Sequence, residues 1–134
     1  MKNSTKKDSH LCPCDSGKPF KDCCQPYLDQ VADATTAEEL MRSRYCAFVL
    51  HNKNYLRYSW HPDTCPKNLN LDEETQWLGL RIKHTEQGQK NDATGRVEFV
   101  ARYKINGKGF RLHENSRFTH YNHRWVYLNG EVAD

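Results

Sequence analysis

The residues of this chain most able to do chemistry are four cysteines near its N-terminus. They form a C-x-C pair followed, eight residues later, by a C-C pair: Cys12, Cys14, Cys23 and Cys24. Four thiolates held by one short loop are the ligand set of a tetrahedral zinc site, and they also suit an iron–sulfur cluster. The interpretation without a metal is a set of free thiols. Because these spacings are less generic than a single C-x-x-C pair, the pattern predicts one structural Zn²⁺ ion.

The segment between the two cysteine pairs is typical of a tight turn. Gly17 can adopt a positive φ and the Ser16 hydroxyl can hydrogen-bond locally, so the turn would return Cys14 toward Cys23. The first 26 residues contain hardly any aliphatic side chains, so they need a bound metal to hold them together. We therefore expect a zinc-binding motif at residues 1–26 and a second domain at residues 27–134.

Composition excludes several classes of protein. The chain has 134 residues, of which 11% are aromatic, and its formal net charge is only +3. This combination argues against disorder and predicts a small aromatic core, and the charge alone does not indicate nucleic-acid binding. The longest apolar run, Cys46 to Leu50, is far shorter than the roughly 20 residues that cross a bilayer. The N-terminal residues lack the apolar stretch of a secretion signal. We expect a cytoplasmic chain with no membrane partner.

Apolar periodicity predicts helices in the first half of the second domain. Thr36 and Glu39 form a capping-box pattern at the start of a 3.6-residue apolar period, which predicts a helix over 37–51. Tyr55 and Tyr58 belong to a second short helix, which the prolines that follow would end. On the first helix, Cys46 is interpreted as a small core residue.

The period changes to two after Trp77, which predicts strands. Leu78 and Leu80 share one face of the first strand, and an Asn-Gly turn at 106–107 predicts a hairpin further on. Helices followed by a four-stranded antiparallel meander predict an α+β fold with the helices packed on one face of the sheet.

Two polar side chains, Glu114 and Ser116, share strand parity with apolar neighbours and should point toward the helices. A buried carboxylate needs a partner, and Arg44, Tyr45 or His61 should supply it. We expect a structural network; the alternative is a polar pocket that binds a ligand. The candidate pocket residues are Arg44, Tyr45, Trp60, His61, Trp77, Glu114, Ser116 and Trp125.

Two stretches of the chain resemble known bacterial sequences. Cys12 to Cys24 resembles the SEC-C motif, the small zinc-binding tail of a protein-translocation ATPase. The rest resembles the YchJ family, also called UPF0225, in four segments: Leu40–Tyr45, Trp60–Pro62, Trp77–Leu80 and His113–Phe118. The resemblance implies a SEC-C motif followed by an NTF2-like domain, a cone of helices on a curved sheet that encloses a pocket. It implies no activity.

Three functions are consistent with these features. By its resemblance, the SEC-C motif should make the chain a binding or adaptor module that docks a protein partner or the ribosome. A closed four-cysteine site has no open coordination position, and no residue is predicted to be catalytic. The alternative is an enzyme or a small-ligand binder that uses the NTF2-like pocket. A third function, RNA binding through the basic last strands, requires Tyr103, Trp125 and Tyr127 to be exposed.

Overall fold

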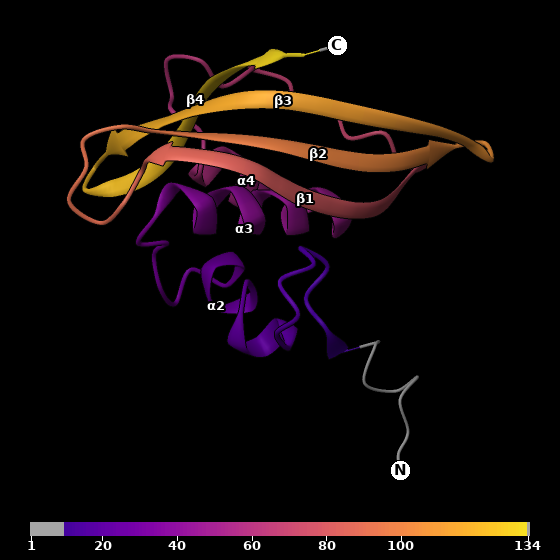
Figure 1. The fold of residues 1–134 in the computed structure, drawn as a ribbon, viewed down its shortest axis with the longest axis horizontal. Coiled ribbons are helices and arrows are strands. Elements are labelled where there is room, and N and C mark those ends of the chain that lie inside the picture. The colour runs from indigo at the N-terminus through magenta and orange to yellow at the C-terminus, as the bar shows by residue number, and fades with distance from the viewer. Residues whose placement is uncertain (1–9, 134) are drawn as a thin grey trace.

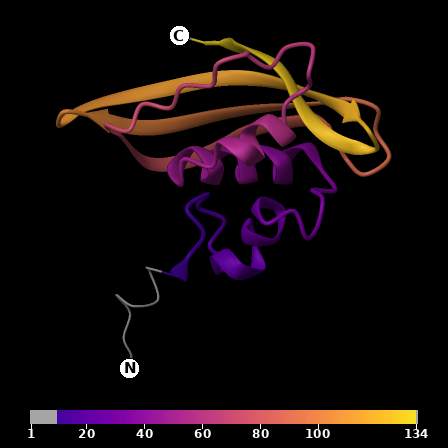
Figure 2. The same cartoon turned by 180° about the vertical axis from the view of Figure 1, so that it is seen from behind.

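A computed structural model describes residues 10–133 as a sheet covered on one face by helices (Figures 1 and 2). Within this range the sheet has four antiparallel strands in the order β1-β2-β3-β4. Helix α3 lies between the sheet and the N-terminal segment (Figure 1). The predicted α+β architecture is confirmed. The elements are η1 (Phe20–Asp22), α2 (Gln25–Leu28), α3 (Ala37–Val49), α4 (Lys53–Tyr58), β1 (Thr75–Gln87), β2 (Gly95–Ile105), β3 (Lys108–Tyr121) and β4 (Arg124–Val132).

Helix α3 begins where its capping pattern predicts. The Thr36 hydroxyl accepts a hydrogen bond from the Glu39 N–H at 3.1 Å, which satisfies one of the free donors of the first turn. The Glu39 carboxylate reaches back one residue further than in the usual capping box and accepts from the Thr35 N–H and hydroxyl. The helix ends at Val49, before the predicted boundary, because His51 adopts a left-handed φ of 57°.

The sheet departs from strict alternation at two places on its first strand, and the first of them changes a prediction. The register of β1 shifts between Trp77 and Gly79, where an extra residue forms a bulge. The prediction that Leu78 faces the core with Leu80 is therefore wrong, since Leu78 is 45% exposed while Leu80 is buried. The predicted Asn-Gly turn at 106–107 is confirmed, and both of its residues have a positive φ.

Helix α3 is buried along most of its length because it is covered on two sides. Three cysteines of the N-terminal motif and Leu28 of α2 belong to the same core as the helix and the sheet. No helix in the described part of the chain is both long and apolar enough to cross a membrane. The buried residues of α3 are Ala37, Leu40, Met41, Ser43, Arg44, Tyr45, Cys46 and Ala47.

We predict that Thr36→Ala lowers the free energy of unfolding by about 1 kcal/mol, because the Glu39 N–H then loses its capping acceptor. Thr36→Ser keeps the hydroxyl and should recover most of this loss. Urea denaturation measures both, with Thr94→Ala at an exposed position of the β1–β2 loop as the control. Equal losses for the serine and alanine variants would contradict the role of the cap.

Candidate metal centre and ligand cavity

The four cysteines of the N-terminal motif converge on one point. Their Sγ atoms all lie within 4.8 Å of one another. Cys14 and Cys23 are 3.7 Å apart, and Cys23 and Cys24 are 3.9 Å apart. A tetrahedron with metal–sulfur bonds of about 2.3 Å has edges of about 3.8 Å, so the spacing suits a single metal ion. The cluster of Cys12, Cys14, Cys23 and Cys24 could therefore hold a metal.

The loop between the cysteine pairs folds as its sequence predicts. The Cys12 N–H donates to the Lys18 carbonyl at 2.8 Å and closes the loop. Gly17 has a φ of 86°, and Asp15 also enters the left-handed region with a φ of 65°. The 3-10 turn η1 then delivers Cys23 to the cluster. Two left-handed residues and one short turn thus bring the pairs together without a hydrophobic core of their own.

Polar contacts to α3 and to β1 attach the motif to the rest of the molecule. Arg42 on α3 donates from Nη1 to the Cys14 carbonyl at 2.8 Å, while its Nε is paired with Glu38 at 3.1 Å. The Asp15 carboxylate accepts the backbone N–H of Leu80 on β1 at 3.0 Å. Because the loop that carries the cysteines contacts both α3 and β1, tertiary packing helps to fix its position.

A fifth thiol lies beside the cluster. Cys46 on α3 is fully buried, and its Sγ is 3.4 Å from the Cys12 Sγ. The hydrogen bond with Cys12 raises the pKa of the Cys46 thiol, which is consistent with Cys46 as the donor. Contact with Cys14 raises the pKa of Cys12, but hydrogen bonds from Cys24 and Cys46 bring it down to about 6. The sequence interpretation of Cys46 as a core residue missed this contact, which no spacing along the chain reveals.

A cavity of about 270 Å³ lies between the helices and the inner face of the sheet. Six of the eight candidate pocket residues line it: Arg44, Tyr45, Trp60, Trp77, Glu114 and Ser116. Sequence reasoning missed six further lining residues: Met41, Phe48, Phe99, Ala101, Leu112 and Tyr127. The wall is therefore mainly apolar and aromatic, with a few polar groups, as in most small-molecule sites.

Glu114 points into this cavity and finds its partners on the sheet. Its Oε2 accepts hydrogen bonds from the Ser116 hydroxyl at 2.7 Å and from the Tyr127 hydroxyl at 3.0 Å. Burial and the Glu114 carboxylate together raise the pKa of Tyr127, so its hydroxyl stays protonated as a donor. The carboxylate lies over Gly130, where a side chain would collide with it. The expected partner from the helical layer is thus wrong.

Arg44 does not pair with Glu114, because its guanidinium donates its hydrogen bonds to groups at the end of α4. Its side chain is 3% exposed, and Nη1 donates to the Leu56 carbonyl at 3.0 Å and to the Ser59 hydroxyl at 2.7 Å. The guanidinium lies 4.6 Å from the ring centres of both Trp60 and Tyr127. Burial lowers the pKa of Arg44 to about 10, so the group remains charged at neutral pH.

The other two candidate pocket residues lie outside the cavity lining. His61 donates its backbone N–H to Tyr127 at 2.8 Å, and its Nδ1 accepts the backbone N–H of Asp63 at 3.0 Å. Trp125 is buried in the core and donates from Nε1 to the Thr35 carbonyl at 3.1 Å. The His61 backbone and the Trp125 side chain each tie a loop to the sheet. The periodicity of the chain places them near the core but does not distinguish cavity walls from filled core.

Comparison with known protein families matches the two parts of this architecture. The model of the YchJ middle NTF2-like domain matches residues 36–130, and the SEC-C motif matches residues 10–26. A UPF0225 protein from Chromobacterium violaceum is 47% identical over 134 residues, which cover 97% of this chain and 98% of the relative. One from Streptomyces coelicolor is 45% identical, over 92% of this chain and 96% of the relative.

Solved structures agree with this assignment. A SEC-C motif containing protein from Rhodopseudomonas palustris superposes with a TM-score of 0.78 at 34% identity, over 92% of this chain and 98% of that one. Another, from Psychrobacter arcticus, has a TM-score of 0.71 at 30% identity, over 92% and 82% of the two chains. The expected SEC-C motif and NTF2-like fold are confirmed, and the chain belongs to the YchJ, or UPF0225, family.

Proposed function

We propose that this protein is a binding module whose NTF2-like cavity takes a small charged molecule, while a structural zinc ion holds its N-terminal motif in place. The observation that carries this proposal is the pair of opposite charges in one cavity. Arg44 and Glu114 both line it, yet within residues 10–133 they form no ion pair with each other. A filled structural core would pair two such charges, because unpaired buried charges cost free energy.

The unused hydrogen-bonding capacity of the cavity indicates the ligand's chemistry. Among the described residues, Arg44 uses only Nη1 and Glu114 uses only Oε2. The buried Trp60 Nε1 also has no hydrogen-bond partner there, which is uncommon for a buried donor. A ligand with an ammonium near Glu114 and a carboxylate near Arg44 would use these groups, and its apolar body would lie among the aromatic rings.

The size of the cavity limits this ligand. A dry cavity of about 150 Å³ holds benzene, so by proportion a cavity of this size has room for roughly eleven non-hydrogen atoms. The volume of this cavity is about 270 Å³. An aromatic amino acid of the size of phenylglycine fits both the volume and the charges. Binding needs no catalytic group, and we propose no reaction.

Zinc is the metal that suits the cysteine cluster best. Four sulfurs within 4.8 Å of one another suit one central ion. An iron–sulfur cluster of four irons would separate them further, because each cysteine binds a different iron atom. With four protein ligands the zinc would have no open position, so its role would be structural.

A second candidate function is docking of a protein partner or the ribosome through the motif, as the SEC-C match suggests. A cleft of about 410 Å³ between the motif and α3 supports it. Exposed Lys18 lines this cleft together with Glu38, Glu39 and Arg42, so the surface offers both charges to a partner. Exposed Lys21 lies nearby in the sequence.

We predict that Glu114→Gln weakens binding of amine-bearing aromatic probes by about tenfold, because a charge-assisted hydrogen bond is lost. The probes are toluene, benzylamine, phenylacetate and phenylglycine, followed through the indole N–H signals of Trp60 and Trp77 in NMR spectra. Phenylglycine should bind best to the unmodified protein. Phenylacetate should be unaffected by the substitution, and the melting temperature should not fall.

Glu98→Gln is the matched control for that experiment, because Glu98 pairs with His113 on the opposite face of the sheet. It should leave all four affinities unchanged. Toluene binding as tightly as phenylglycine, or a lower melting temperature of the Glu114 variant without any change in binding, would contradict the ligand-binding proposal.

We predict one zinc ion per chain by elemental analysis of protein purified without chelator. Cys46→Ala should keep this stoichiometry but lose zinc to a chelator about tenfold faster, since groups that hydrogen-bond metal ligands tune affinity by that order. Cys65→Ala, in a loop, should behave like the unmodified protein. Iron in place of zinc, or almost no metal, would contradict the site.

We predict that Lys18→Glu/Lys21→Glu and Cys23→Ser/Cys24→Ser both lose the partners that the tagged protein captures from its native bacterium. Lys67→Glu/Lys90→Glu makes the same charge change at exposed positions elsewhere and should retain them. Mass spectrometry of the captured proteins and ribosomal subunits measures the result. Identical capture by all four proteins would exclude the motif as the docking element.

A further inference from the structure

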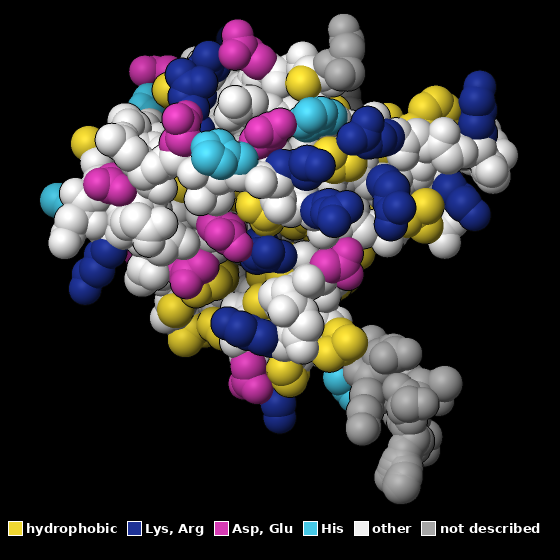
Figure 3. Space-filling view, viewed as in Figure 1, with side chains coloured by type: hydrophobic (Ala, Val, Ile, Leu, Met, Phe, Trp, Pro, Cys, Tyr) yellow, Lys and Arg dark blue, Asp and Glu magenta, His cyan; other side chains and the backbone are white. Residues whose placement is uncertain are grey.

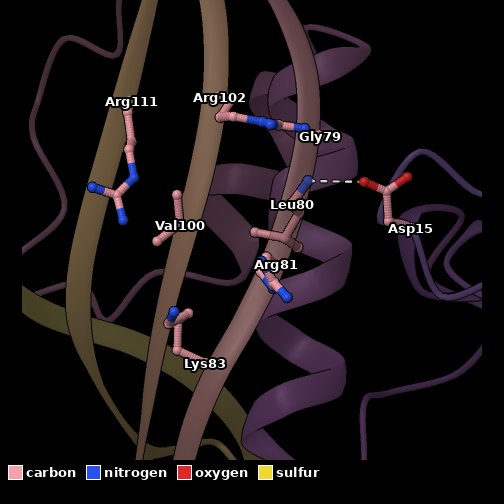
Figure 4. A pocket seen from close by; sticks show the side chains of 8 residues that line it. All are labelled: Asp15, Gly79, Leu80, Arg81, Lys83, Val100, Arg102 and Arg111. Atoms are coloured by element: carbon pink, nitrogen blue, oxygen red, sulfur yellow. Dashed lines mark hydrogen bonds between the residues drawn. The ribbon is translucent and has the colours of Figure 1, made fainter.

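The outer face of the sheet is free of helices and carries a group of basic side chains. Figures 1 and 2 show the helices on the other face only, and Figure 3 shows Lys and Arg gathered over the sheet. Four exposed residues, which we call the basic face, line a shallow hollow of about 180 Å³ there (Figure 4): Arg81, Lys83, Arg102 and Arg111. The basic face lies on the other side of the sheet from the inner cavity, and Asp15 of the cysteine loop borders its hollow.

The strand register concentrates these charges. Arg102 on β2 lies directly opposite Arg111 on β3. Arg81 on β1 lies opposite Val100, which is two residues before Arg102 on β2. Like charges directly opposite each other on a sheet destabilise it. Val100 between them is only 7% exposed, as expected where arginine stems cover an apolar side chain. The arrangement therefore costs stability and keeps four positive groups over a small area.

Nearby carboxylates do not neutralise the basic face. Across the described range, none of its four residues has an ion pair within 4.0 Å, whereas Arg117, elsewhere on the same sheet, is paired with Glu131 at 3.0 Å. Asp15 lies at the edge of the hollow and accepts the backbone N–H of Leu80 (Figure 4). Glu98 is occupied by His113 at 2.6 Å. The positive charges are therefore available to an external anion.

We propose that the basic face binds the phosphodiester backbone of a single-stranded nucleic acid. Arginine's planar fork matches phosphate oxygens, and a nucleic-acid strand supplies the run of anions that four clustered cations require. An acidic protein partner fits less well, because the two apolar side chains that line the hollow, Leu80 and Val100, are buried and offer little to anchor it. An extended strand can lie along an open sheet face.

This mode differs from the stacking that the sequence suggested. Trp125 is 3% exposed and Tyr127 lines the inner cavity, so neither presents a ring to the solvent on the outer face. The contacts would therefore be to phosphates rather than to bases. Binding should be independent of sequence and strongly dependent on salt, with a log–log slope of about −0.7 for each phosphate contact on a single strand.

Fluorescence anisotropy with labelled twelve-nucleotide oligo(U) and oligo(dT) tests the proposal. With four contacts the slope of log affinity against log salt should be about −3 for the unmodified protein. Arg102→Gln/Arg111→Gln should weaken binding by about tenfold at low salt and bring the slope to about −1.4. The melting temperature should stay the same or rise, because the substitutions remove a repulsion. Lys53→Gln/Lys67→Gln removes the same charge elsewhere and should change neither quantity.

Comparison of oligo(U) with oligo(dT) distinguishes RNA from DNA as the source of the phosphodiester backbone. Equal affinity indicates phosphate contacts alone, and a preference for oligo(U) indicates additional contacts to the 2′-hydroxyl; both support the proposal. Three results would overturn it: no binding, equal loss in the Lys53/Lys67 control, or a polyglutamate peptide that binds as tightly as the oligonucleotides. The second result would indicate diffuse attraction, and the third a preference for acidic protein.

Discussion

One side of helix α3 packs on the sheet, and the other side packs on the cysteine motif. This double burial places two chemically different residues, Arg44 and Cys46, only two positions apart on the same helix. Arg44 lines the inner cavity, whereas Cys46 contacts the Cys12 thiol of the cluster. Helix α3 therefore separates the inner cavity from the cysteine motif and contacts both.

The inner cavity keeps its two charges apart by giving each one separate support. Arg44 is held by a carbonyl and a hydroxyl at the end of α4 and by two aromatic rings. Glu114 is held by two hydroxyls that belong to the sheet. Each support stabilises a charge without neutralising it, since neither includes an opposite full charge. The sheet and the helices consequently contribute one sign each to the same cavity.

Features set by local sequence could be predicted, and features set by tertiary packing could not. The cysteine spacing, the Thr36 cap and the Asn-Gly turn at 106–107 act within a few residues, and the structure confirms the geometry of the cap and the turn. Strand parity correctly placed Glu114 on the helix-covered face. Strand parity placed Leu78 on the wrong face, because β1 has a bulge there that the alternation of apolar residues does not predict.

In the candidate site, too, the sequence predicted which residues lie near the cavity but not the contacts that depend on tertiary packing. Six of the eight candidate pocket residues line the cavity. The partner of Glu114 could not be predicted, because it depends on Arg44 being drawn toward α4 instead. The contact between Cys46 and the cluster likewise requires knowing that the motif folds back on α3. The basic character of the last strands was visible in the sequence, but the addition of Arg81 and Lys83 from β1 to Arg102 and Arg111 was not, because it depends on strand pairing.

The contact between Asp15 and β1 has a consequence for the behaviour of the protein in concentrated solution. Strand β1 is at the edge of the sheet, and edge strands expose N–H groups that can pair with the sheet of another molecule. The Asp15 carboxylate occupies one of these groups, the N–H of Leu80, beside the bulge that already interrupts the strand. The cysteine loop therefore also covers part of the sheet edge, and displacement of this loop would expose a strand on which aggregation can begin.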